Sequence, residues 1–165
     1  MKADKLYLVG FMGAGKSTVA RALGRRTGWR VEDIDERIEA REHRTVASIF
    51  GQQGEAHFRQ LERMELGELV SARHVVVATG GGTFIEADNR ALMLADGVVA
   101  WLDLALPGVL ERVPVDGRRP LAADRAQMEQ LYTRRQLAYA HAHVRVDASR
   151  PVEEIVGRLL EWIDF

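Results

Sequence analysis

Short apolar runs alternate with longer amphipathic stretches along this chain of 165 residues. The short runs are rich in β-branched residues and predict strands, whereas the longer stretches repeat apolar residues at helical spacing. Strands are expected at 6–9, in a short segment ending near 31, and at 75–78, 98–102 and 144–146. Helices are expected at 16–27, 35–42, 45–50, 55–71, 86–95, 106–112, 125–141 and 151–163. This alternation predicts an α/β fold in which helices flank a mostly parallel sheet.

One stretch, residues 112–124, fits neither a strand nor a regular helix. Its sequence RVPVDGRRPLAAD contains two prolines, a glycine and three arginines, which predicts a mobile loop. Taken alone, an ordinary surface loop with solvated arginines explains the segment equally well. Because the chain has no internal repeat, low-complexity tract or linker, we expect residues 1–165 to form a single domain.

The composition favours a small molecule as the partner. Lysine and arginine together number 23 and aspartate and glutamate 24, so the basic excess of a nucleic-acid or polybasic membrane protein is missing. The chain contains no cysteine, which excludes disulfides, thiolate metal sites and cysteine nucleophiles and leaves oxygen ligands for any metal. No apolar run has the length of a signal segment or a membrane span, so we expect a cytoplasmic protein without nucleic-acid or membrane partners.

The segment LYLVGFMGAGKST carries the strongest motif of the chain. Gly10, four further residues and then Gly15-Lys16-Ser17 match G-x-x-x-x-G-K-[ST], after a predicted strand and at the start of a predicted helix. Glycines let successive N–H groups wrap a phosphate, Lys16 adds a positive charge for the β and γ phosphates, and the Ser17 hydroxyl suits Mg²⁺. A glycine-rich turn with an exposed lysine is the alternative. The motif predicts that the chain binds a nucleoside triphosphate with Mg²⁺.

Kinases, ATPases and GTPases share this loop, so the phosphate acceptor has to be sought elsewhere in the sequence. Asp33 and Asp35 in VEDIDERIE would point the same way if the strand continued through them. Paired carboxylates beside a triphosphate could hold metal-bound water and a hydroxyl group. Alternatively, Asp35 caps the next helix.

Two further segments are candidates for the acceptor site. Arg59 and Glu62 lie one helical turn apart, either as an exposed ion pair or as an arginine that binds a carboxylate and is held by the glutamate. The strand at 75–78 ends in three glycines, which would let a ligand approach the backbone at the carboxyl edge of the sheet. A plain flexible turn is the alternative for the glycines.

Six segments in this order resemble the shikimate kinases over nearly the whole chain: GFMGAGKST, DIDERIE, GEAHFRQLE, TGGG, GRRPL and RRQLAY. The resemblance implies a fold like that of nucleoside monophosphate kinases, with five parallel strands in the order 2-3-1-4-5 and a mobile lid over residues 112–124. It implies ATP-dependent phosphorylation of the 3-hydroxyl of shikimate, in the route to chorismate and aromatic amino acids. The expected partners are therefore ATP and shikimate, and the expected state is a monomer.

The resemblance also implies roles for individual residues on the nucleotide side. Lys16 and the lid residue Arg119 would neutralise the transferring phosphoryl group, with the neighbouring Arg118 as the alternative to Arg119. Mg²⁺ would be bound by Ser17 directly and by Asp33 through water. The residues implied to bind the nucleotide are Gly13, Ala14, Gly15, Lys16, Ser17, Thr18, Arg112, Arg119 and Arg150.

On the acceptor side, the resemblance implies that Asp35 accepts hydrogen bonds from the hydroxyl groups of shikimate and takes the proton of the attacking one. Arg59 and Arg135 would hold the carboxylate, with Glu62 orienting Arg59 and the Gly81 N–H contacting a hydroxyl group. The residues implied to bind shikimate are Asp35, Arg59, Glu62, Gly80, Gly81, Gly82 and Arg135. The alternatives are another small-molecule P-loop kinase, for gluconate or a nucleoside monophosphate, and a nucleotide-binding module without activity.

Overall fold

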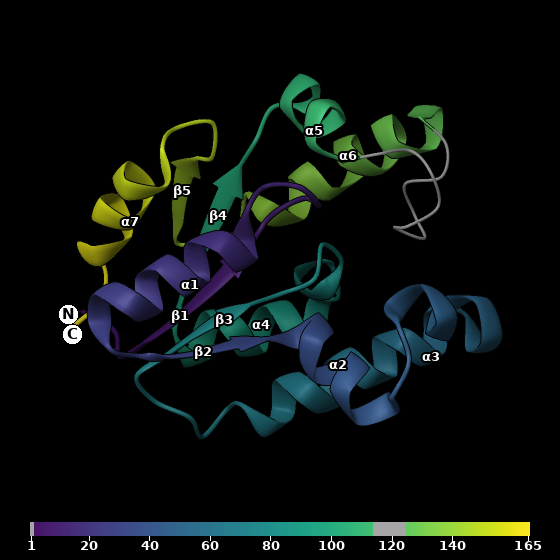
Figure 1. Ribbon diagram of the computed structural model, residues 1–165, viewed down its shortest axis with the longest axis horizontal. Helices are drawn as coiled ribbons and strands as arrows, with labels where there is room; N and C mark the ends of the chain where they lie inside the picture. The colour runs from purple at the N-terminus through teal and green to yellow at the C-terminus, as the bar shows by residue number, and fades with distance from the viewer. Residues whose placement is uncertain (1, 114–124) are drawn as a thin grey trace.

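The computed structural model describes residues 2–113 and 125–165 and contains a five-stranded sheet in the order β2-β3-β1-β4-β5 (Figure 1). The strands are β1 Lys5–Val9, β2 Arg30–Asp33, β3 Val75–Ala78, β4 Val98–Asp103 and β5 Val144–Asp147. All neighbouring strands are parallel, and Leu6 of β1, for example, lies between Val76 of β3 and Val98 of β4. The predicted fold class and strand order are confirmed.

Helices flank the sheet on both faces. They are α1 Lys16–Thr27, α2 Ile34–Glu42, α3 Val46–Glu68, α4 Ala87–Asp96, α5 Leu106–Arg112, α6 Arg125–Tyr139 and α7 Val152–Leu160, with a short 3-10 helix η1 Thr83–Ile85. In Figure 1, α1 lies in front of the sheet and contacts α7, whereas α4 lies behind the sheet. Within the described ranges, no helix combines the length and the apolar composition that crossing a bilayer requires.

Helix α3 joins two helices that the sequence predicted separately, at 45–50 and 55–71. The two parts meet at Gly54, whose φ of 83° and ψ of 173° are not helical. Residues with a Cβ rarely adopt such a positive φ, so a glycine is needed for this kink. The kink sets the direction of the second part, which carries Arg59 and Glu62.

The core lies on both faces of the central strands β1, β3 and β4, whose residues are nearly all buried, while the edge strands β2 and β5 are partly exposed. This burial is expected for valine-rich runs in a parallel sheet that helices cover. Lys5 is a charged exception in β1: its side chain is fully buried, and its Nζ lies 2.6 Å from Asp96 Oδ2. Because the strands are parallel, the loops that follow β1, β2 and β3 meet at one edge of the sheet, where a site is expected.

Candidate active site

The loop between β1 and α1 has the backbone conformation of a phosphate cradle. Gly13 and Gly15 have φ angles of 81° and 97°, and a Cβ on Gly13 would lie only 2.5 Å from Val113 Cγ2. Both positions therefore favour glycine, and Gly15 leads directly into the N-terminus of α1. Lys16 Nζ donates hydrogen bonds to Gly10 O at 2.7 Å and Phe11 O at 3.1 Å, which holds its positive charge across the loop.

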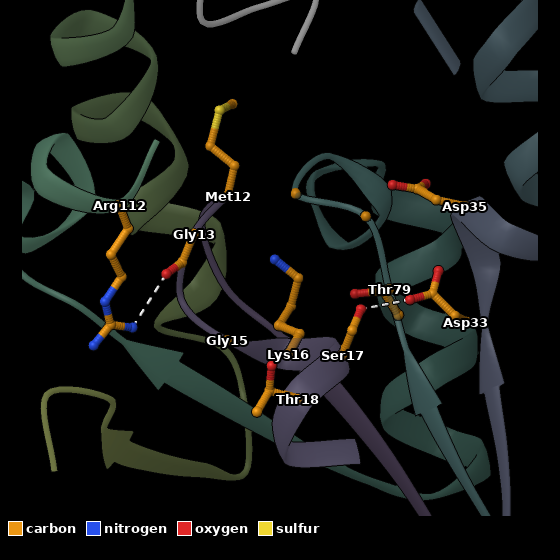
Figure 2. A pocket seen from close by; sticks show the side chains of 12 residues that line it. Met12, Gly13, Gly15, Lys16, Ser17, Thr18, Asp33, Asp35, Thr79 and Arg112 are labelled. Atoms are coloured by element: carbon orange, nitrogen blue, oxygen red, sulfur yellow. Dashed lines mark hydrogen bonds between the residues drawn. The ribbon is translucent and has the colours of Figure 1, made fainter. Parts of the chain in front are cut away.

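A cavity of about 350 Å³ opens above this loop (Figure 2). It brings together three stretches of chain that follow β1, β2 and β3, and Arg112 at the end of α5. Arg112 donates a hydrogen bond from Nη1 to Gly13 O at 3.2 Å, as the dashed line in Figure 2 shows. The cavity is lined by Met12, Gly13, Gly15, Lys16, Ser17, Thr18, Asp33, Asp35, Thr79, Gly80, Gly81 and Arg112.

Ser17 and Asp33 form a pair of oxygen ligands suited to Mg²⁺. The Ser17 hydroxyl donates a hydrogen bond to Asp33 Oδ2 at 2.6 Å, and both side chains line the cavity (Figure 2). Across residues 2–113 and 125–165, no group of three or more His, Cys, Asp or Glu side chains could hold a metal ion. These hard oxygens therefore fit an ion that takes its remaining ligands from phosphates and water, as Mg²⁺ does in P-loop proteins.

The helix cap that the sequence allowed for Asp35 is made by Asp33 instead. Strand β2 ends at Asp33, and the Asp33 carboxylate accepts a hydrogen bond from the N–H of Glu36 in the first turn of α2. Asp35 lies two residues further on, inside the helix. The condition that the strand continue through both aspartates is not met, because α2 begins between them. The two carboxylates nevertheless line the same cavity.

Asp35 is an ionisable group with an unpartnered oxygen at the cavity. Its Oδ1 atom is buried and has no hydrogen-bond partner. Burial raises the pKa of Asp35 to about 7, with further increases from the negative charges of Glu62, Asp33 and Glu39 and a decrease from Lys16. A carboxylate with a pKa near neutrality and a free acceptor oxygen can bind a hydroxyl group and take up its proton.

A second cavity of about 330 Å³ is lined by two arginines, Arg59 and Arg135. The side chain of Arg59 is 11% exposed and its Nη1 lies 2.5 Å from Oε1 of Glu62, which is fully buried. The exposed ion pair considered for these residues is therefore wrong. Arg135 is also buried, and its guanidinium lies over the Phe11 ring, 5.8 Å from the centroid. The cavity is lined by Glu55, Arg59, Gly82, Ile85, Glu86, Leu131, Arg134 and Arg135.

The two arginines make this cavity suitable for an anion. Burial lowers the pKa of Arg135, and the nearby positive charge of Arg59 lowers it further. A bound carboxylate would offset both effects, and the planar guanidinium group is well matched to the two oxygens of a carboxylate. The geometry therefore favours an acidic ligand between Arg59 and Arg135.

The three glycines after β3 lie between the two cavities. Gly80 and Gly81 line the first cavity and Gly82 lines the second. A Cβ on Gly81 would lie 2.8 Å from Arg135 Nη1, and a Cβ on Gly82 would overlap the Arg59 guanidinium. Side chains at these positions would displace both arginines, so the glycines serve close packing and are more than a flexible turn.

Comparison with known proteins places the chain in a family. A family model described as shikimate kinase matches residues 12–164. The chain belongs to the shikimate kinase family. A shikimate kinase of Persephonella marina is 39% identical over 160 residues, which cover 93% of this chain and 98% of that protein.

Solved structures of the family agree closely with this kinase. The shikimate kinase from Acinetobacter baumannii in complex with shikimate matches with a TM-score of 0.91 and 33% identity, covering 96% of this chain and 92% of that one. The shikimate kinase from Aquifex aeolicus matches with a TM-score of 0.87 and 34% identity, covering 95% of this chain and 94% of that one. The recognition of the family from six sequence segments is confirmed.

Some residues predicted for the nucleotide side of this kinase are not placed at the P-loop cavity. Arg150 is exposed, pairs with Glu154 at 2.8 Å, and lines a different cavity beside α7. Arg119, the alternative Arg118 and most of the predicted lid lie in 114–124, outside the described residues. The roles of these arginines stay predictions.

The structure adds lining residues that the sequence analysis did not single out. Met12 and Thr79 line the P-loop cavity, and Glu55 and Arg134 line the cavity of the two arginines. All four lie within or directly beside the segments that carry the family resemblance. Their position in these segments could have marked them as candidate site residues, but only the folded chain shows which residues of the segments face a cavity.

Proposed function

We propose that this kinase transfers the γ-phosphoryl group of ATP to the 3-hydroxyl group of shikimate, in the route to chorismate and aromatic amino acids. The position of Asp35 is the observation that supports this most directly. Asp35 lines the cavity of the P-loop lysine and has one buried oxygen without a hydrogen-bond partner, and the charge of the buried Glu62, which pairs with Arg59, acts on it. Shikimate is a small triol with one carboxylate. The Asp35 carboxylate can accept hydrogen bonds from its hydroxyl groups, and the two arginines can bind its carboxylate.

On the nucleotide side, the N–H groups of residues 13–18 and the Lys16 ammonium bind the phosphates of ATP. Ser17 directly and Asp33 through water hold Mg²⁺, which neutralises phosphate charge when it is bound. Arg112 extends the positive charge along the cavity from α5. We assign to Arg119 of the predicted lid the role of neutralising the charge of the transferring phosphoryl group, as the family resemblance implies.

On the acceptor side, Arg59 and Arg135 bind the carboxylate of shikimate, and Glu62 fixes the direction of Arg59. Asp35 accepts a hydrogen bond from the 3-hydroxyl group, and the N–H of Gly81 contacts another hydroxyl. As the 3-oxygen forms its bond to the γ-phosphorus, the bond from phosphorus to the bridging oxygen of ADP breaks and the hydroxyl proton passes to Asp35. Phosphoryl transfer needs mainly alignment and charge neutralisation, which these residues supply.

An assay of ADP release with ATP and Mg²⁺ tests the acceptor. We expect release with shikimate and none with gluconate, with CMP or without an acceptor. Release with another acceptor would overturn the acceptor site while keeping the P-loop assignment. No release with any acceptor would favour a nucleotide-binding module.

Two substitutions test the assigned residues. Asp35→Asn should abolish turnover and leave ATP affinity near normal. Arg59→Ala should raise the KM for shikimate far more than the KM for ATP. Arg63, an exposed arginine of the same helix, provides the matched control, and Arg63→Ala should change neither KM. Equal effects of Arg59→Ala on both KM values would contradict a carboxylate site.

We further propose that the kinase acts as a monomer in the cytoplasm. The family resemblance, which implies a monomer, supports this proposal. Sedimentation velocity with and without ATP and shikimate measures the state, and a stable dimer would contradict a monomer.

A further inference from the structure

Thr83 follows the three glycines directly and has a fully buried side chain. Its hydroxyl donates a hydrogen bond to Glu62 Oε2 at 2.7 Å and accepts one from the Gly80 N–H at 3.1 Å. The carbonyl of Thr83 accepts a third bond from Asn89 Nδ2 of α4, at 3.1 Å. Thr83 is thus fixed to the scaffold by its backbone, while its hydroxyl bridges the glycine segment and the acceptor-side glutamate.

Glu62 connects this bridge to Arg59. One carboxylate oxygen of Glu62 accepts from Thr83, and the other lies 2.5 Å from Arg59 Nη1. Four groups therefore form one chain of hydrogen bonds with a buried centre, from the Gly80 N–H through the Thr83 hydroxyl and the Glu62 carboxylate to the Arg59 guanidinium. Buried polar chains of this kind hold each member in one orientation, because breaking one bond leaves a buried group unpaired.

The same glutamate oxygen lies close to Asp35. A Cβ on Gly80 would be 3.1 Å from Glu62 Oε2 and 3.0 Å from Asp35 Oδ1, so both carboxylates pack against the Gly80 backbone. Beside the Gly80 backbone, the Thr83 hydroxyl donates the hydrogen bond that Glu62 Oε2 accepts. Without that donor, Glu62 would be free to turn toward other donors in the site. The exposed Glu55, whose Oε1 lies 3.2 Å from Arg59 Nη2, would then be the carboxylate left to direct Arg59.

We propose that Thr83 is a positioning residue that holds the side chain of Glu62, and through it that of Arg59, in a fixed position relative to Gly80–Gly82. By doing so it sets the affinity for the carboxylate of the acceptor. The inference rests on the proposed acceptor site and adds a residue that does not line either cavity. Thr83 acts without touching the substrate, so its removal affects the acceptor and leaves the nucleotide untouched.

Substitutions of Thr83 give a sharp test. Thr83→Val keeps the shape and removes both the donor and the acceptor, which leaves the Gly80 N–H and Glu62 Oε2 unpaired. We expect the KM for shikimate to rise roughly 10- to 100-fold, with the KM for ATP unchanged within twofold. Thr83→Ser keeps the hydroxyl and should restore the shikimate KM to within about threefold of wild type.

Thr27 at the end of α1 offers a matched control. Its hydroxyl also makes two hydrogen bonds, donating to Leu23 O at 2.8 Å and accepting from the Trp29 N–H at 3.1 Å, away from both cavities. Thr27→Val should lower the melting temperature and leave both KM values unchanged. If Thr83→Val does not accumulate as folded protein, Thr83→Ala removes the same hydroxyl with less crowding and replaces it in every comparison.

Arg59→Ala separates this inference from the proposed function. If Arg59→Ala raises the shikimate KM and the Thr83 variant leaves it within twofold of wild type, the inference is wrong and the proposed site stands. If Arg59→Ala has no effect either, the proposed site itself is wrong. In the Arg59→Ala background, Thr83→Val should change the shikimate KM less than twofold, and fully additive effects would overturn an action through Arg59.

Discussion

Replacing Asp35 by asparagine should stabilise the ligand-free kinase at alkaline pH, although it abolishes turnover. Burial and the neighbouring negative charges raise the pKa of Asp35 to about 7 in the folded chain, whereas a solvated aspartate has a pKa of about 3.9. The folded state therefore holds the Asp35 proton more tightly than the unfolded state does. Ionising Asp35 at high pH thus destabilises the fold, and asparagine, which has nearly the same shape, carries no such charge.

The size and sign of the effect follow from proton linkage. Below about pH 4 both states are protonated and Asp35 does not lower the stability; the loss of stability grows as the pH rises from about 4 to about 7 and then levels off. Above about pH 8 it reaches roughly 4 kcal/mol, and between pH 5 and pH 8 it increases by about 2.5 kcal/mol. For a chain of this size, that increase corresponds to a gain in melting temperature of roughly 5–10 °C for Asp35→Asn relative to wild type.

Thermal melts of both proteins between pH 5 and pH 8.5, followed by circular dichroism, measure this gain. Asp164 is an exposed carboxylate near the end of the chain, and Asp164→Asn serves as the control. Its melting temperature should differ from wild type by the same small amount at every pH. A difference between Asp35→Asn and wild type that stays constant, or shrinks, as the pH rises would refute the burial of an ionisable Asp35 beside Glu62.

Three further predictions concern separate features of the structure, the third with a control substitution. Tyr139→Phe removes the partly buried hydrogen bond from the Tyr139 hydroxyl to Gly81 O, at 2.5 Å, and should lower the free energy of unfolding in urea by about 1–2 kcal/mol; an unchanged denaturation midpoint would contradict it. Ser17→Ala should raise the Mg²⁺ concentration needed for half-maximal activity, and an unaltered Mg²⁺ titration would exclude Ser17 as a ligand. Gly54→Ala forces a side chain into a φ of 83° and should cost about 1–3 kcal/mol of stability. As a control, Gly67→Ala in the same helix places its Cβ against no neighbour and should stabilise the folded protein by roughly 0.5–1 kcal/mol. If Gly54→Ala were the more stable of the two variants, a Cβ at Gly54 would not strain the kink.

The sequence alone located the secondary structure and the phosphate loop. Short apolar runs and helical periodicity placed the five strands and the α-helices near their observed bounds, because both signals reflect burial of one strand or one helix face, but they gave no sign of the 3-10 helix Thr83–Ile85. The loop from Gly10 to Ser17 was equally clear, since the spacing of its glycines and lysine is required by the phosphate that it wraps. Even the kink at Gly54 was visible as a break between two predicted helices.

Only the tertiary structure decided what the acceptor-side residues do. From the sequence, Arg59 and Glu62 could equally form a surface ion pair. Folding buries Glu62, leaves the Arg59 side chain only 11% exposed, and places Arg135 of a distant helix in the cavity that Arg59 lines. The raised pKa of Asp35 comes from burial and from charges on other elements, and the contacts of Thr83 and Tyr139 join segments far apart along the chain. Local sequence fixes propensity and spacing, whereas burial, pKa and long-range hydrogen bonds depend on which surfaces meet when the helices pack on the sheet.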